Sequence, residues 1–220
     1  MRLLALGGIA GPLVFSVVAI VSASLRTDYS HVADFISELG ATGTPYAGLM
    51  NYAGFLPGGL MLAAFGVALT RALPRRPAAT LAVILVILFG AVVAVSGIVS
   101  CDPGCPQGEG SAENLVHNTI APIAFFCLIV AAGILGFLFR GHTAWRFLSV
   151  FSLVSSVVGL CLLLALASSL DSRELTGLWQ RLLLAVLFLW CAVVGLRGFR
   201  LLGASSDDGT QPSRGQAARG

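Results

Sequence analysis

The chain contains no lysine and few charged residues of any kind. Of its 220 residues, 10% are charged, and all 13 basic residues are arginine. A soluble domain carries about 25% charged residues, so this chain cannot cover a water-facing surface. With 57% hydrophobic residues, the composition is typical of a membrane protein, and no separate soluble domain is visible. The missing lysine and the abundant Ala, Gly, Leu and Arg suggest a GC-rich bacterial genome.

The chain also lacks alternation of polar and apolar residues, which excludes membrane-spanning strands. It has instead six long apolar runs, and a helix needs about 20 residues to cross the hydrocarbon. These runs predict an all-α bundle of six transmembrane helices in residues 1–200. The helices are expected at about 3–25, 48–69, 78–99, 115–139, 147–170 and 178–196. Residues 201–220 are rich in Gly, Ser, Asp and Gln, which predicts a disordered cytoplasmic tail.

The first apolar run has two interpretations. Arg2, Ala23 and Ser24 are compatible with a signal peptide. However, the run is longer than the 7–15 apolar residues of a signal core, so an uncleaved helix is favoured.

The arginines predict the orientation of the bundle. With the N-terminus in the cytoplasm, ten arginines lie inside and three, Arg26, Arg173 and Arg181, lie outside. This bias predicts a plasma-membrane protein with both termini cytoplasmic. Eight of the ten acidic residues then lie outside: Asp28, Asp34, Glu38, Asp102, Glu109, Glu113, Asp171 and Glu174.

The first outer loop, "DYSHVADFISELG", predicts a short amphipathic helix on the membrane surface. Val32, Phe35, Ile36 and Leu39 form an apolar stripe at helical spacing, with His31, Asp34 and Glu38 opposite. Gly40 is placed to end this helix. In the next span, Pro57-Gly58-Gly59 predicts a break below Asn51 that opens a cavity under the outer loops.

The second outer loop contains the pair Cys101 and Cys105 within "CDPGCP". An oxidising outer compartment favours a disulfide, and Asp-Pro-Gly forms a tight turn between the two cysteines. The alternatives are reduced or metal-binding thiols and unpaired structural thiols. Zinc needs about four Cys or His ligands, and only His117 is near in sequence, so no metal site is predicted.

Polar residues of several elements are expected to meet at the outer end of the bundle. An ionisable residue inside a span usually has a partner, which makes Arg181 informative. It would pair with Glu38, Asp34 or Asp102, reach the surface, or hold an anionic ligand. His117 would hydrogen-bond across helices, act as a general base, or bind metal. The candidate catalytic residues are Glu38, His117 and Asp34, and the candidate ligand-binding residues are Arg181, Gln180, Asn51, Asn114 and Asp102.

A serine nucleophile is a weaker interpretation of the same cluster. Ser37 with His117 as base and Asp34 or Asp102 as orienter would fill the roles of a triad. No nucleophile-elbow motif surrounds Ser37.

Several motifs together resemble one family. "SELGATGTPYAGLMNYAGF", "CDPGCP", "NLVHN" and "GLWQR", in this order, are similar to the DUF998 family of prokaryotic membrane proteins. The resemblance covers about residues 5–200 and implies a six-helix integral membrane protein. It implies no catalytic set.

Three classes of function remain open on the sequence. The preferred hypothesis is a membrane protein that binds a lipid or isoprenoid-like molecule in an outer polar pocket. The alternatives are a membrane enzyme using acid–base residues of that pocket, and a non-catalytic structural or partner-binding subunit. A transporter is least favoured, because no ionisable residue lies mid-span and no inverted repeat is clear. Membrane lipids are the expected partners, and neither a cofactor nor nucleic acid is expected.

Overall fold

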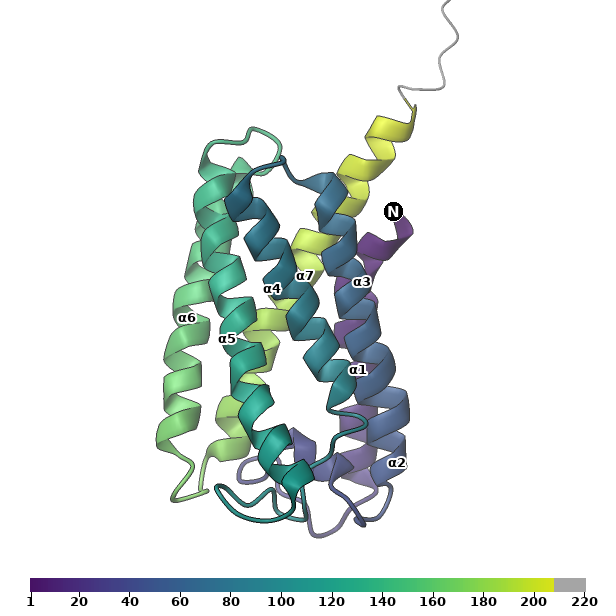
Figure 1. Cartoon of the computed structure of the whole chain (residues 1–220), viewed down its shortest axis with the longest axis vertical. Helices are drawn as coiled ribbons and strands as arrows, with labels where there is room; N and C mark the ends of the chain where they lie inside the picture. The colour runs from purple at the N-terminus through teal and green to yellow at the C-terminus, as the bar shows by residue number, and fades with distance from the viewer. Residues whose placement is uncertain (208–220) are drawn as a thin grey trace, which may run out of the picture.

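The chain folds into a bundle of long helices (Figure 1). The computed structural model describes residues 1–207, with side chains described for residues 1–204. Six helices in this part of the chain are long and apolar enough to cross a membrane. The predicted all-α bundle of six spans is therefore confirmed. The second span is made of α2, the π-helical turn η3 and α3. The elements are η1 Leu3–Leu6, α1 Gly7–Ser24, η2 Ile36–Gly40, α2 Ala47–Leu49, η3 Met50–Phe55, α3 Leu56–Ala72, α4 Pro77–Val95, α5 Ala112–Arg140, η4 Arg146–Leu148, α6 Ser149–Ser168 and α7 Thr176–Asp207.

Three local features differ from the sequence-based expectations. The last helix continues to Asp207 instead of ending near 196, so residues 201–207 of the expected tail are helical, and 208–220 lie outside the described residues. The second span changes to π-helical geometry at Met50–Phe55, one turn before the expected break at Pro57. The first loop contains only a short 3-10 helix, η2, which is tucked under the loops. Its Glu38 is buried instead of facing water.

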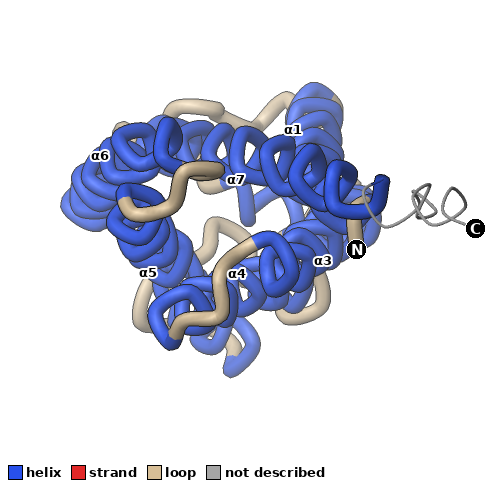
Figure 2. The backbone as a smooth tube through the Cα atoms, turned by 90° about the horizontal axis from the view of Figure 1, so that it is seen from above, coloured by secondary structure: helices blue, strands red, loops and turns tan. Residues whose placement is uncertain are grey.

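The six spans form a ring in which each packs against its neighbours in sequence. Seen from above, α7 closes the ring by packing against α1 as well as α6 (Figure 2). Successive spans run in opposite directions, as in up-and-down helix bundles (Figure 1).

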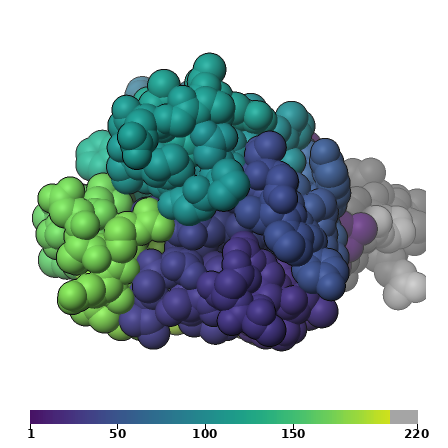
Figure 3. Space-filling model, turned by 90° about the horizontal axis from the view of Figure 1, so that it is seen from below, coloured from purple at the N-terminus to yellow at the C-terminus, as the bar shows by residue number. Residues whose placement is uncertain are grey.

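Charge divides between the two ends of this bundle. The arginine end carries the N-terminus and the loops 73–76 and 141–145, together with Arg2, Arg71, Arg75, Arg76, Arg140, Arg146, Arg197 and Arg200 (Figure 1). The opposite end, the loop end, is covered by residues 25–46, 96–111 and 169–175, which meet over the bundle (Figure 3). All the acidic residues at 1–206 belong to this end.

A pair of glycines sets how closely α3 and α4 approach. A Cβ atom on Gly59 would lie 2.2 Å from the backbone nitrogen of Ala94, and one on Gly90 would lie 2.3 Å from that of Ala63. Both distances are far below van der Waals contact, and the opposing atoms are backbone. Small residues at such positions let membrane helices pack through dispersion contacts that larger side chains would prevent.

We therefore expect Gly59→Ala to destabilise the protein by about 1–3 kcal/mol, the usual cost of overpacking. Thermal unfolding in detergent would show the loss as a lowered midpoint. Gly48→Ala is the matched control, because a Cβ atom there meets only the Tyr52 ring at ordinary distance, 3.8 Å. Equal midpoints for Gly59→Ala and the wild type would contradict the close approach.

Candidate functional site

Glu38 is the most buried acidic side chain of the loop end, with 8% of its surface exposed. Its Oε1 atom accepts hydrogen bonds from the backbone N–H of Phe35 at 3.0 Å and from the Arg173 guanidinium at 2.5 Å. Burial raises the pKa of Glu38, and these two donors oppose the rise without cancelling it. Arg173 also donates to the carbonyl oxygen of Gly104 at 3.0 Å and lies over the Phe35 ring. Arg173 therefore joins all three loops of this end, through its ion pair with Glu38 and its hydrogen bond to Gly104.

Arg173 is a residue that sequence reasoning missed as a site residue. Its loop, "LDSRELTG", contains no recognisable motif. The available signal was the small number of arginines at this end of the chain. Each of the three donates to a loop carbonyl: Arg26 to Glu38, Arg173 to Gly104 and Arg181 to Asp34.

Arg181 does not form the expected ion pair with Glu38, Asp34 or Asp102. It donates to the carbonyl oxygens of Asp34 at 3.0 Å and Gly177 at 2.9 Å, and to the Tyr29 hydroxyl. Burial raises the pKa of Tyr29 to about 12, so its hydroxyl stays protonated at neutral pH and donates to the carbonyl of Phe35 at 3.0 Å. Arg181 thus holds the backbone of the first loop against α7.

Asn114 organises the second loop from the first turn of α5. Its side chain is fully buried, accepts from the backbone N–H of Asp102 at 3.1 Å, and donates to the carbonyls of Pro106 and Glu109. The Asp102 carboxylate accepts from both the backbone and the hydroxyl of Ser111, the N-cap of α5. All polar atoms of the Asn114 amide are therefore used for loop structure.

Asn51 performs the same task for the first loop. Its amide donates to the carbonyl of Gly40 at 2.9 Å and to the hydroxyl of Ser100 at 3.1 Å. The Asn51 Oδ1 atom lies so close that a Cβ atom on residue 40 would be 2.1 Å from it. Glycine is required at position 40 for this contact, in addition to its place at the end of η2.

Cys101 and Cys105 are joined in a disulfide that is buried under the loops. The Ser37 hydroxyl lies 3.5 Å from the Cys105 sulfur. A disulfide sulfur carries no hydrogen, so Ser37 is the donor, and the lone pairs of its oxygen remain free to accept.

His117 and Gln180 each use one polar atom for the fold. The Nδ1 atom of His117 lies 2.8 Å from the carbonyl oxygen of Val99, which can only accept, so Nδ1 carries a proton. In the neutral imidazole, Nε2 then bears the lone pair. The Oε1 atom of Gln180 accepts from the backbone N–H of Ile36 at 2.7 Å. Among the described residues, neither His117 Nε2 nor Gln180 Nε2 has a protein partner, and neither atom is completely enclosed.

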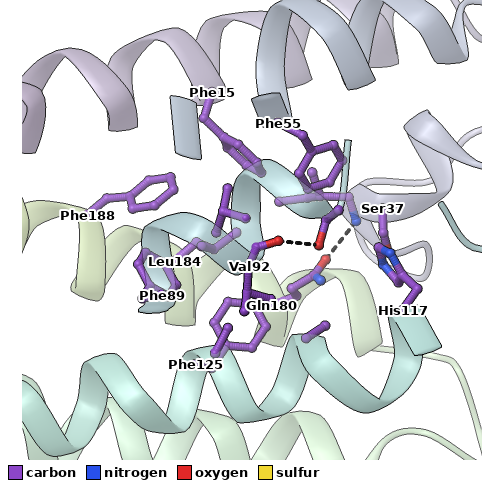
Figure 4. Close-up of a pocket in the computed structure, with 15 residues that line it drawn as sticks. Phe15, Ser37, Phe55, Phe89, Val92, His117, Phe125, Gln180, Leu184 and Phe188 are labelled. Carbon is purple, nitrogen blue, oxygen red and sulfur yellow. Dashed lines mark hydrogen bonds between the residues drawn. The ribbon is translucent and has the colours of Figure 1, made fainter. Parts of the chain in front are cut away.

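Two cavities meet at these residues, and both are lined by Ser37, His117, Ala121, Phe125 and Gln180. The inner cavity, about 50 Å³, lies within the bundle, with Phe15, Phe55, Phe89 and Phe188 also on its walls. In Figure 4, Ser37 and His117 lie at one end of it, and Phe89 and Phe188 lie toward the other. The side cavity, about 100 Å³, extends between α5 and α6 along Pro122, Leu163 and Ala167.

The three candidate catalytic residues do not share these cavities. His117 lines both, whereas Glu38 and Asp34 line neither. The Asp34 carboxylate instead accepts from the backbone N–H of Ser30 at 2.7 Å. Among the candidate ligand-binding residues, only Gln180 lines them. Arg181 borders a separate groove between α1 and α7. Within the part of the chain described, no group of His, Cys, Asp and Glu is placed to hold a metal ion.

The fold and the loop-capped end define a multi-pass helical membrane protein. A family model described as "Protein of unknown function (DUF998)" matches residues 9–197, and the chain belongs to this family. Comparison with curated proteins and with solved structures gave no significant match.

The raised pKa of Glu38 predicts how stability depends on pH. The ordinary pKa of a glutamate side chain is 4.5. Because the pKa of Glu38 is higher than this in the folded protein, the folded protein holds the Glu38 proton more tightly than the unfolded chain does. Glu38 therefore contributes most stability below that value, and the contribution falls as pH rises through the folded pKa. We expect the unfolding midpoint of the wild type, relative to Glu38→Gln, to decline from pH 4 to neutral pH.

Parallel unfolding curves in detergent at several pH values would measure this difference. Glu174→Gln is the control, because that carboxylate is exposed. A difference that grows with pH would mean that attraction to Arg173 outweighs the cost of burying the charge.

Proposed function

We propose that this membrane protein binds a lipid or isoprenoid-like molecule at the meeting point of the inner and side cavities. The observation that carries the proposal is the presence there of polar atoms without protein partners, on His117 and Gln180, beside walls of phenylalanine. Apolar pockets with a few converging polar groups are typical of small-molecule sites.

The side cavity provides a route from the bilayer. Pro122 and Ala167 are exposed on the outer faces of α5 and α6, and both line this cavity. A lipid in the surrounding membrane would enter between these helices with its polar head directed toward His117. Its tail would stay among the exposed apolar residues of the two spans.

The volumes of the two cavities limit how much of a lipid molecule they can enclose. Sites that enclose a complete ligand usually have about 300–1,000 Å³, whereas these have about 50 and 100 Å³. The site therefore suits the head of a lipid and its first carbons.

Acid–base catalysis by Glu38, His117 and Asp34 is less well supported, because only His117 borders the space. A purely structural role accounts for Asn114 and Arg181, but not for the unpartnered atoms of His117 and Gln180.

We also propose that the protein lies in the plasma membrane with the arginine end in the cytoplasm. The separation of arginines and acidic residues to opposite ends supports this orientation. The disulfide at the loop end suits an oxidising compartment.

Cysteine labelling on intact cells tests the orientation. A membrane-impermeant maleimide should label Ser172→Cys, in an exposed loop of the loop end, without permeabilisation. Thr143→Cys, exposed at the arginine end, should be labelled only after permeabilisation. The wild type measures background from native thiols. The reverse pattern would overturn the proposed orientation.

Lipid retention tests the binding proposal. Ala121 lines both cavities, so Ala121→Leu should fill the space where they meet. We expect mass spectrometry of the purified protein to show severalfold less co-purifying lipid for this variant. Ala78→Leu, at an exposed position of α4 near the arginine end, is the matched control. Equal lipid content in the wild type, the control and Ala121→Leu would refute the site.

A further inference from the structure

The walls of the two cavities carry no carboxylate and no guanidinium group among the described residues. The charged groups nearest in the fold are used elsewhere. Glu38 pairs with Arg173, and Arg181 is engaged by two backbone carbonyls and Tyr29. A charged head would therefore enter a largely apolar space without a counter-charge, which is costly.

The polar atoms on the walls that both cavities share define a specific pattern of hydrogen bonding. Gln107 and Asn118 line the side cavity alone, and each donates to a loop carbonyl. His117 Nε2 offers a lone pair and can only accept in the tautomer fixed by Val99. The Ser37 oxygen can also accept, because a hydroxyl that donates to the Cys105 sulfur keeps its lone pairs free. The Nε2 amide of Gln180 offers two donor hydrogens, because its Oε1 atom is already bonded to Ile36. A ligand must therefore both donate and accept, without carrying charge.

From this pattern we infer that the ligand is an uncharged lipid alcohol, an inference that rests on the proposed function. One hydroxyl group satisfies both requirements, by donating its hydrogen to His117 Nε2 and accepting from Gln180 Nε2. The first carbons of its chain would contact Phe125 and the apolar residues of the side cavity. A lipid phosphate would present several acceptor oxygens and a negative charge, and the cavity walls hold no cation to pair with it. An ether would accept from Gln180 and leave His117 unsatisfied.

Three probes with the same C15 isoprenoid chain separate these cases: farnesol, farnesyl methyl ether and farnesyl phosphate. Each would compete with radiolabelled farnesol for the purified full-length protein in nanodiscs. We expect farnesol to bind best, with the ether weaker by roughly threefold to tenfold, the typical effect of one hydrogen bond. The phosphate should be weaker than farnesol. A phosphate that binds best would overturn the inference while leaving the lipid site standing.

His117→Asn isolates the role of the free imidazole nitrogen. The asparagine amide can replace Nδ1–H as donor to the Val99 carbonyl, but it has no atom at the Nε2 position. Farnesol should lose roughly threefold to tenfold in affinity, whereas the ether, which makes no bond to Nε2, should be unchanged. His142→Asn, at the arginine end, controls for the substitution itself and should leave both affinities unchanged.

Two outcomes of this comparison count against the inference. If His117→Asn weakens the alcohol and the ether equally, His117 acts only through the fold, and the assigned hydrogen bond is wrong. If His117→Asn weakens the binding of neither probe, the hydroxyl group of the ligand does not reach His117 Nε2. Saturable binding of none of the probes, together with unchanged lipid content in Ala121→Leu, would instead refute the proposed function itself.

Discussion

The structure of the loop end depends on one requirement: the backbone of three irregular loops must find hydrogen-bond partners where it covers an apolar bundle. Buried N–H and C=O groups without partners cost as much as lost hydrogen bonds. Regular secondary structure cannot supply the partners here, because the loops contain only the short helix η2. Polar side chains at the helix ends supply them instead. Asn51, Asn114, His117 and Gln180 each bond to loop backbone from the helices beneath.

The positions of the arginines at the loop end follow from the same need to supply hydrogen bonds to the loop backbone. A guanidinium has five donors, so it can bind carbonyl oxygens and still carry out another task. Arg26, Arg173 and Arg181, the three arginines at the loop end, each bind a loop carbonyl. Only Arg173 has a buried carboxylate as its second partner. That ion pair is costly to bury and costly to break, so its main effect is to fix one arrangement of the three loops.

The sequence predicted the spans because length and hydropathy determine them locally. It also predicted that polar residues would gather at one end, because charge partition follows from the spans. The pairing within this cluster could not be predicted. Arg173 and Arg181 have the same chemistry and both contact the first loop, and which of them pairs with Glu38 depends on the path of a loop without regular structure. The form of the first loop was misjudged for a related reason. Its apolar spacing fits a surface helix, but Asn51, Gln180 and Arg181 bind its backbone and hold it in a tighter conformation.

The use of charge in the loops explains why the cavities beneath them are neutral. Each ionised group that approaches the bundle interior is already held by a loop, and moving it toward a ligand would leave backbone groups unpaired. The walls that both cavities share present what remains: the second nitrogen of His117, the amide of Gln180 and the oxygen lone pairs of Ser37. These are atoms that the loops do not need. A polar site made in this way can select a hydroxyl by its donor and acceptor pattern without using a hydrogen bond that the loop end needs.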